Sequence, residues 1–224
     1  MSNAEKHGQQ DYRVVLLGKV GAGKSASGNT LLGTSSFSCR VSPSQVTQQC
    51  ESQTVTVRGR QVTVVDTPGL TAEMASDTAK EKLLQCLQLS APGPHVFLLV
   101  IPVGRFTQED KDTVERVVDM FGKKLYKFTI ILFTFKDSLK DMSIEEHISA
   151  AGDSLKQLVQ KCGRRYNAFN NNSPRENNQV DQLFLKMEEL VAANDGKRYS
   201  NTDDEVEDLE IRQNHQHLGD NDSK

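Results

Sequence analysis

The sequence predicts an α/β fold with a mostly parallel central sheet and helices on both of its faces. Two observations predict it. Short apolar runs rich in Val, Ile and Leu alternate with longer amphipathic stretches along the chain. The first apolar run also ends abruptly at a glycine-rich segment, "GKVGAGKS" at 18–25, which a helix-like pattern follows. Strands that alternate with helices form parallel sheets whose crossover helices cover both faces.

The predicted strands are short apolar or alternating β-branched runs bounded by turn-forming residues. In chain order they are 12–17, 51–59, 60–66, 95–101, 126–133 and 165–169. The second and third divide at Arg58–Gly59–Arg60, which predicts a β-hairpin. The runs at 95–101 and 126–133 are continuously apolar, which is typical of central strands covered on both faces.

Three amphipathic helices are predicted from apolar residues at helical spacing. Their stripes are Val114, Val117, Val118 and Phe121; Ile144, Ile148, Ala151, Leu155 and Leu158; and Val180, Leu183, Phe184, Met187, Leu190 and Val191. Thr107 is the expected N-cap of the first helix. Ser143 and Glu146 form a capping-box pattern before the second, and Gly163 is its expected stop.

Composition bounds the class of protein. The chain has 224 residues and a formal net charge of −3, without a basic excess. This argues against a nucleic-acid-binding surface, since such affinity rests on Lys and Arg that neutralise phosphates. The four cysteines are scattered without a CxxC pair, which predicts reduced thiols in a cytoplasmic protein. The longest apolar run, 96–101, is far shorter than the roughly 20 residues of a membrane-spanning helix.

The glycine-rich segment fits the phosphate-loop pattern G-x-x-x-x-G-K-[ST]. The matching residues are Gly18, Lys19, Val20, Gly21, Ala22, Gly23, Lys24 and Ser25, and Ala26 follows them in the helix. The glycines let backbone N–H groups converge on phosphate oxygens, and the helix adds its positive end. Lys24 is predicted to reach the β- and γ-phosphates and the Ser25 hydroxyl to ligate Mg²⁺. The alternative is a glycine-rich turn that binds nothing.

A second motif, "VVDTPGL" at 64–70, ends a predicted strand and matches the D-x-x-G pattern of GTPases. Asp66 is predicted to hold Mg²⁺ through a water, and the backbone N–H of Gly69 to contact the γ-phosphate. The alternative is an ordinary turn, because Asp, Pro and Gly are common turn formers. Its position downstream of a phosphate loop favours the nucleotide site.

The base-reading residues are expected at the end of a later strand. Thr134, Phe135, Lys136 and Asp137 lie where GTPases usually carry N-K-x-D. A carboxylate at the last position accepts from both N1–H and the 2-amino group of guanine, a pair that adenine lacks, so Asp137 is the predicted guanine reader. The alternatives are a solvated helix-capping aspartate at Asp137 and a core side chain at Phe135.

The stretch "GPHVFLLVIPVGRFTQEDKDTVERVVDMFG" at 93–122 resembles the box between these two motifs in the GIMAP family. These are the immunity-associated nucleotide-binding proteins, septin-like P-loop GTPases with an AIG1-type G domain. "VTQQC" at 46–50, "DTPGL" at 66–70 and "RYNAFNN" at 165–171 match as well, and the resemblance covers about residues 10–190.

The resemblance implies a P-loop G domain that binds GTP and GDP with Mg²⁺. It implies that Thr47 is the switch threonine whose hydroxyl ligates Mg²⁺, although Ser44 is a rival, and that Asn170 lies against the guanine. Asn170 is alternatively one more residue of an asparagine-rich loop. Two positions depart from the family: Phe135 replaces a basic residue or histidine, and Asp137 replaces the more usual glutamate.

Hydrolysis is expected to be slow. Ras-like enzymes often place a glutamine after D-x-x-G to orient the attacking water, but Leu70 stands here. Two functions compete: a slow GTPase stimulated by GTP-dependent homodimerisation, and a GTP-dependent assembly switch with negligible hydrolysis. An ATP-using kinase or ATPase is disfavoured by the DTPG motif and Asp137.

Arg105 is the candidate catalytic residue in trans. It follows the predicted strand at 95–101, so it should share the rim formed by the other motifs. The resemblance implies that this rim forms a dimer interface, because septin-like GTPases often pair across the nucleotide face. A two-fold contact would place Arg105 near the phosphates of the other subunit, as an arginine finger. The alternative is a surface arginine that pairs with Glu109 or Asp110.

Three parts are expected along the chain: a flexible N-terminus at 1–10, an AIG1-type GTP-binding domain at 11–193, and a disordered acidic tail at 194–224. The tail shows no apolar face, so we expect it not to pack on the domain.

Overall fold

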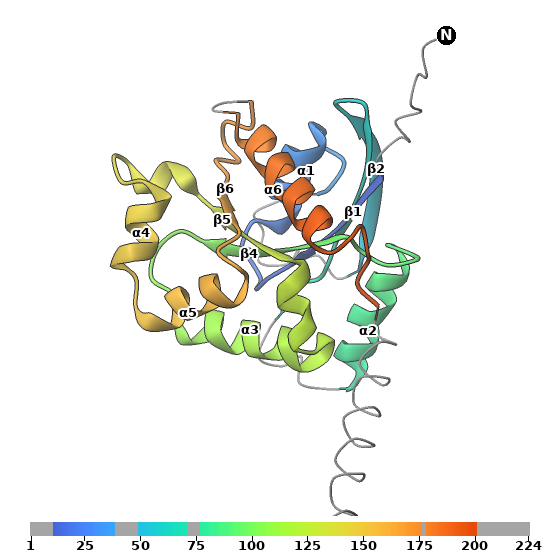
Figure 1. Cartoon of the computed structure of the whole chain (residues 1–224), viewed down its shortest axis with the longest axis horizontal. Coiled ribbons are helices and arrows are strands. Elements are labelled where there is room, and N and C mark those ends of the chain that lie inside the picture. The colour runs from blue at the N-terminus through green and yellow to red at the C-terminus, as the bar shows by residue number, and fades with distance from the viewer. Residues whose placement is uncertain (1–10, 39–48, 71–76, 176–177, 201–224) are drawn as a thin grey trace, which may run out of the picture.

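The computed structural model describes residues 11–38, 49–70, 77–175 and 178–200. Its six strands form one sheet in the order β2-β3-β1-β4-β5-β6 (Figure 1). The strands are β1 (Asp11–Leu17), β2 (Glu51–Val57), β3 (Arg60–Asp66), β4 (Val96–Pro102), β5 (Thr129–Thr134) and β6 (Tyr166–Ala168). Only the β2–β3 hairpin pairs antiparallel; the other neighbours run parallel. The predicted α/β fold is confirmed.

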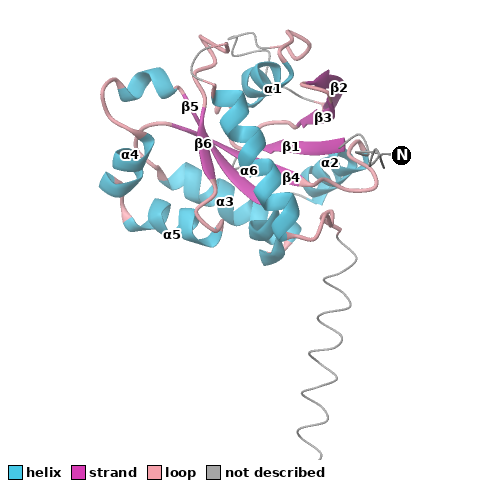
Figure 2. Ribbon diagram, turned by 45° about the horizontal axis from the view of Figure 1, so that its top comes forward, coloured by secondary structure: helices cyan, strands magenta, loops and turns pink. Residues whose placement is uncertain are grey.

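Helices cover both faces of this sheet (Figure 2). They are α1 (Lys24–Leu32), α2 (Asp77–Gln88), α3 (Gln108–Phe121), α4 (Ile144–Ala150), α5 (Asp153–Lys161) and α6 (Gln179–Ala193), with 3₁₀ turns η2 (Lys123–Phe128) and η3 (Lys136–Leu139). Helices α1 and α6 pack on one face, and α2, α3 and α5 pack on the other. Within the described part of the chain, no helix is both long and apolar enough to cross a membrane.

Two local expectations differ from the structure, and one helix was not expected at all. The single helix expected over 144–158 is divided, because Ala151 and Gly152 are both extended (ψ 161° and 164°) and end α4 before α5 begins. The strand expected from residue 126 begins at Thr129, because residues 123–128 turn as a 3₁₀ helix that buries Leu125 and Phe128. The helix α2 was not predicted from the sequence.

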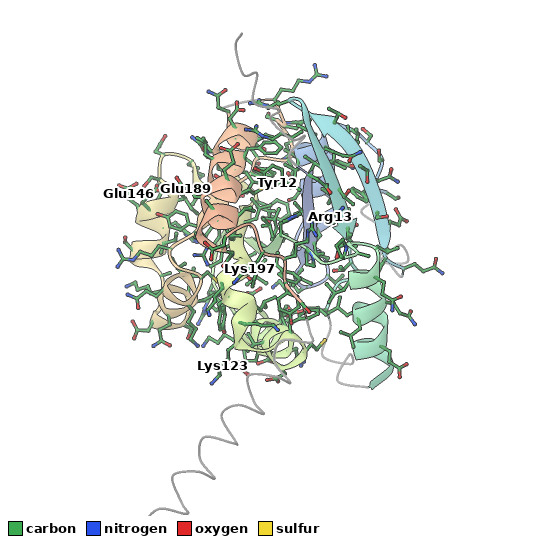
Figure 3. The ribbon with its side chains drawn as sticks, turned by 45° about the vertical axis from the view of Figure 1, so that its right-hand side comes forward. Tyr12, Arg13, Lys123, Glu146, Glu189 and Lys197 are labelled. Atoms are coloured by element: carbon green, nitrogen blue, oxygen red, sulfur yellow. A yellow bond between two sulfur atoms is a disulfide. The ribbon has the colours of Figure 1, made fainter. Side chains whose placement is uncertain are left out.

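Apolar and aromatic side chains point toward the faces of the sheet, and most charged side chains lie on the outer surface of the helices. Tyr12 of β1 points inward, and its ring lies 6.1 Å from that of Phe184 on α6. Glu146 of α4 and Glu189 of α6 lie on the exposed outer side of their helices (Figure 3). The predicted amphipathic stripe of α6 therefore faces the sheet.

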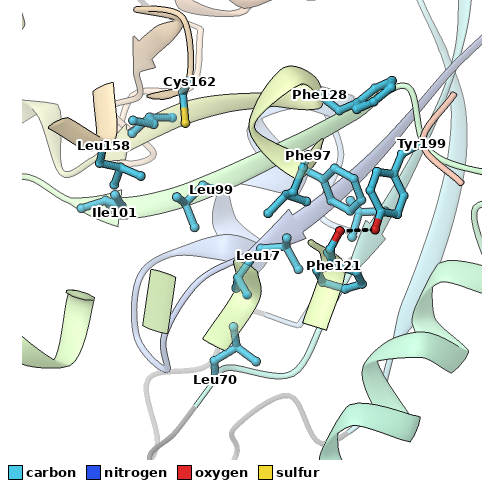
Figure 4. Close-up of a cluster of buried hydrophobic side chains, with 14 of the residues drawn as sticks. Leu17, Leu70, Phe97, Leu99, Ile101, Phe121, Phe128, Leu158, Cys162 and Tyr199 are labelled. Carbon is cyan, nitrogen blue, oxygen red and sulfur yellow. Dashed lines mark hydrogen bonds between the residues drawn. The ribbon is translucent and has the colours of Figure 1, made fainter. Parts of the chain in front are cut away.

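The packed part of the chain extends beyond the boundary expected at residue 193. Tyr199 is 2% exposed and lies among the rings of Phe97, Phe121 and Phe128 (Figure 4). Its hydroxyl donates to the Phe121 carbonyl, and its backbone N–H donates to the Pro94 carbonyl. The expectation that nothing after residue 193 packs on the domain is therefore wrong at Tyr199. Residues 1–10 and 201–224 lie outside the described residues.

The expectation of four reduced cysteines is also wrong for one pair. Cys50, just before β2, and Cys86, on α2, form a disulfide with their Cα atoms 5.4 Å apart. The two are 36 residues apart in the sequence, and only the packing of α2 beside the sheet brings them together. Cys162 is a buried free thiol, as expected, and Cys39 lies outside the described residues.

Candidate nucleotide-binding site

The predicted motifs meet at one edge of the sheet, where the parallel strands end. The phosphate loop follows β1, the DTPG segment ends β3, the Arg105 loop follows β4, and the base-reading residues follow β5. In this order β1 lies between β3 and β4. The connection that leaves β1 therefore runs toward the β2–β3 side of the sheet, and the connection that leaves β3 runs to the other side of β1, toward β4. Open α/β sheets bind ligands at such a switch point.

The phosphate loop has the conformation that its glycines permit. Gly23 caps α1 with φ 90°, a left-handed conformation that favours glycine. Lys24 is 6% exposed, and its ammonium donates to the carbonyls of Gly18 (3.1 Å) and Lys19 (2.9 Å). Burial lowers the pKa of Lys24 to about 8, partly offset by the charge of Asp66. A phosphate group beside it would favour the charged form.

Ser25 and Asp66 form the candidate magnesium site. The Ser25 hydroxyl donates to Oδ2 of Asp66 over 2.5 Å. Asp66 is 2% exposed, and its Oδ1 has no hydrogen-bond partner among the described residues. Burial raises the pKa of Asp66 against the hydrogen bond from Ser25 and the charge of Lys24. A buried carboxylate oxygen without a partner, beside a hydroxyl, fits Mg²⁺, which prefers oxygen ligands.

Gly69 packs directly against the phosphate loop. A Cβ on Gly69 would lie 2.5–2.7 Å from atoms of Val20, including its backbone nitrogen, so a larger residue would push the DTPG segment off the loop. The next residue, Leu70, donates its N–H to the Gly18 carbonyl over 3.1 Å. The Leu70 side chain is 1% exposed in the core, so it cannot orient a water at the phosphates.

The first two residues of the base-reading motif have different roles. The Thr134 hydroxyl is fully buried and donates to the Ala22 carbonyl over 2.7 Å, which ties the motif to the phosphate loop. Phe135 has φ 58° and is 43% exposed, so the alternative of a core side chain is wrong. An exposed ring at this rim is available for stacking on a base.

Asp137 and the asparagine loop face each other. Asp137 is exposed, and its Oδ2 accepts from the Asn172 side-chain amide over 3.2 Å. The Asn170 side-chain oxygen accepts from the Asn172 N–H, while its backbone is bonded to Gln179. Asn171 is bonded to Ser27 and Thr30 of α1. Asn170 therefore lies beside the candidate base site but uses its side-chain oxygen within its own loop.

Arg105 lies exposed on the loop between β4 and α3. The alternative partners considered for it, Glu109 and Asp110, contact Lys19 of the phosphate loop instead, with Nζ–O distances of 3.3 and 2.9 Å. Within the part of the chain that the structure describes, no ion pair involves Arg105. Thr47 and its rival Ser44 lie outside the described residues.

Comparison with known proteins agrees with this geometry. The model of the AIG1 family matches residues 12–218. The chain belongs to the AIG1 family.

Its relatives include GTPase IMAP family member 8 from Mus musculus, 39% identical over 188 residues, which are 83% of this chain and 27% of that protein. Immune-associated nucleotide-binding protein 9 from Arabidopsis thaliana is 35% identical over 195 residues, 84% of this chain and 57% of that protein. This AIG1-family chain thus spans between about a quarter and three fifths of the length of these relatives.

Solved structures share the fold. Toc33 from Arabidopsis thaliana in complex with GDP and Mg²⁺ has a TM-score of 0.64 at 21% identity, covering 84% of this chain and 86% of that chain. A dimerization-deficient arginine-to-alanine mutant of Toc33 has a TM-score of 0.65 at 22% identity, with the same coverage. At such identities the likeness shows the fold of this AIG1-family chain.

Two contacts of the AIG1-family site were missed from the sequence. The pairing of Asn172 with Asp137 lay within the asparagine run, where nothing separates one asparagine from the next. The pairing of Lys19 with Asp110 joins residues that are far apart in the sequence. In the sequence, the four residues of these contacts could be identified only as polar residues within recognised motifs, and their pairing could not be predicted.

Proposed function

We propose that this chain binds GTP and GDP with Mg²⁺ and hydrolyses GTP slowly, with turnover stimulated by GTP-dependent homodimerisation. The observation that carries the proposal is the convergence of Lys24, Ser25 and Asp66 at the end of the phosphate loop, where one Asp66 oxygen has no partner among the described residues. The relatives named GTPase IMAP family member 8 support the same activity.

Each residue contributes one step. The backbone N–H groups of the phosphate loop and the Lys24 ammonium hold the phosphates, and Ser25 and Asp66 hold the magnesium ion, Asp66 through a water. A magnesium ion held there would neutralise charge that develops on the transferring phosphoryl group. The Gly69 N–H contacts the γ-phosphate, while Asp137 accepts from the guanine edge and Phe135 stacks on its face.

In this proposal, dimerisation supplies a catalytic group that Leu70 cannot provide. Leu70 is buried and cannot position the attacking water, whereas Arg105 is exposed and is not ion-paired to any described residue. An arginine from the opposite subunit would offset the charge of the transition state. Dimerization is important for the GTPase activity of the chloroplast translocon components atToc33 and psToc159, which share this fold. Their behaviour supports the analogous role here.

The second candidate is a GTP-dependent assembly switch with negligible hydrolysis, and the buried Leu70 favours it. Thr47 as a Mg²⁺ ligand and a cytoplasmic location stay predictions.

The deciding experiment combines two measurements on the full chain. Mass spectrometry identifies the nucleotide carried through purification, and single-turnover hydrolysis is followed across protein concentrations.

We expect guanine nucleotide and a rate per molecule that rises with concentration. Adenine nucleotide alone, or no nucleotide binding at all, would contradict the proposal. A flat and negligible rate with GTP bound would favour the switch.

A further inference from the structure

Lys19 is the residue where three parts of the site meet. Its carbonyl accepts from the Lys24 ammonium over 2.9 Å. Its backbone forms a parallel bridge with Leu70, directly after the DTPG segment. Its own ammonium reaches across to the start of α3, where it lies 2.9 Å from Oδ1 of Asp110. The position of Lys19 therefore affects both the phosphate-binding lysine and the segment that follows Gly69.

Asp110 is a fixed partner for Lys19. Its side chain is only 7% exposed. Its Oδ2 accepts from the Thr107 N–H over 2.8 Å and from the Thr107 hydroxyl over 2.7 Å, in the capping box of α3. That arrangement leaves Oδ1 directed to Lys19. Glu109 also contacts Lys19 but is 63% exposed, and exposed ion pairs contribute little because water and salt screen them.

Both partners keep their charges. Burial alone would raise the pKa of Asp110, but the hydrogen bonds from Thr107 and Lys19 outweigh it and lower that pKa. Burial alone would lower the pKa of Lys19, but the hydrogen bonds and charges of Asp110 and, to a smaller extent, Glu109 together outweigh it and raise that pKa. The contact is thus a largely buried, charged hydrogen bond, the class that is costly to break from one side.

We propose that Asp110 is a positioning residue for the nucleotide site, which acts through Lys19 to hold the first half of the phosphate loop in place. If the Lys19 side chain is released, its carbonyl is free to move, and with it the ammonium of Lys24. The β4–α3 loop thereby acquires a role in binding nucleotide without touching it. The inference rests on the proposed function only in that the wild-type chain binds guanine nucleotide.

The test uses variants that keep the local structure of α3. Asp110→Asn keeps an acceptor for Thr107 but removes the charge. Lys19→Met keeps the apolar stem of the side chain but removes the ammonium. Each should weaken binding of GDP and of a nonhydrolysable GTP analogue by roughly tenfold, within the ~5–150-fold range of coupling between distinct sites. The double variant should be no weaker than either single one, because both remove the same contact.

Controls separate positioning from stability. The Glu109→Gln variant should bind GDP and the GTP analogue with an affinity within about twofold of the wild type, since the contact of Glu109 with Lys19 is exposed. Lys19→Arg retains the positive charge and should recover most of the affinity. Melting temperatures are measured for every variant without nucleotide. A loss of affinity that appears only where the melting temperature collapses, or losses that add in the double variant, would overturn the proposal.

The experiment distinguishes failure of the proposed function from failure of this inference alone. A wild-type chain that binds no guanine nucleotide overturns the proposed function and this inference together. A wild-type chain that binds it, with both single variants binding equally well, overturns this inference alone.

Discussion

Tyr199 is hydrogen-bonded through its hydroxyl to the backbone carbonyl of Phe121, at the end of α3. The ring lies edge-on to Phe97, with centroids 5.1 Å apart, and the Lys124 ammonium lies 5.1 Å from its centroid. A single aromatic residue after the last helix thus closes one end of the core between β4 and α3.

Replacing Tyr199 should destabilise the domain. Tyr199→Ala should lower the free energy of unfolding by about 3–5 kcal/mol, as large-to-small core changes of aromatic residues do. Tyr199→Phe keeps the ring but leaves the Phe121 carbonyl without its donor, and should cost about 1–2 kcal/mol. Denaturant unfolding of the three chains measures both. Equal stability of all three would mean that the ring does not pack as described.

Two truncations locate the end of the folded unit. A chain ending at Asn194 loses Tyr199, and its melting temperature should fall by roughly 10 °C, since 1 kcal/mol corresponds to about 2–4 °C at this size. A chain ending at Ser200 keeps the ring and is the matched comparison. If the two melt at the same temperature, residues 195–200 do not contribute to the core.

Lys24→Ala should abolish nucleotide binding while the fold survives. The change removes the main cation of the phosphate loop, and the buried ammonium contacts only loop carbonyls within the described residues. Calorimetric titration with GDP and GTP measures the loss, and circular dichroism checks the fold. Unchanged GDP affinity would contradict the assignment of the phosphate loop.

The pKa of Lys24 predicts a pH dependence of binding. Its value is lowered to about 8 by burial, and bound phosphates stabilise the charged form, so they raise the pKa again. Below pH 8 the lysine is already protonated, and affinity should be flat. Above pH 8 binding must take up a proton, and GDP affinity should fall as pH rises. Calorimetry between pH 7 and 9, in buffers of different ionisation enthalpy, measures the proton uptake; its absence above pH 8 would count against this pKa.

Asp137→Ala should reduce the preference for GTP over ITP. The guanine 2-amino group, which ITP lacks, loses its acceptor, and an unpaired buried group costs about 1–3 kcal/mol. Asp141→Ala, an exposed aspartate four positions on, is the matched control and should bind as the wild type does. Competition binding with GTP and ITP decides between them. If Asp137→Ala discriminates as strongly as the parent, another residue reads the base.

Arg105→Ala should remove the rise of specific activity with protein concentration, while GTP affinity stays within a few-fold. Arginine fingers contribute about 10³–10⁵ in rate where they act in other systems. Arg105→Lys keeps the charge but loses the planar fork, and should recover only part of the rise. Lys123→Ala, an exposed cation beyond the far end of α3, is the control. A rise that persists in Arg105→Ala excludes the role in trans.

The sequence by itself determined the fold class and located the motifs that we propose bind phosphate. Both depend on patterns local to the chain: Gly18–Ser25 and Asp66–Gly69 combine fixed spacing with residue types that few other structures need. The hairpin at Arg58–Gly59 and the buried run of β4 follow from the same local rules.

Only the tertiary structure decided which distant residues meet. The disulfide of Cys50 with Cys86, the burial of Tyr199, and the contact of Lys19 with Asp110 each join segments that are remote in the sequence. The division of α4 from α5 at the extended residues Ala151 and Gly152 was likewise not evident from the apolar stripe in the sequence. The physical reason is that local propensity and periodicity state which face of an element is apolar, whereas the partner of a given side chain depends on how all the elements pack together.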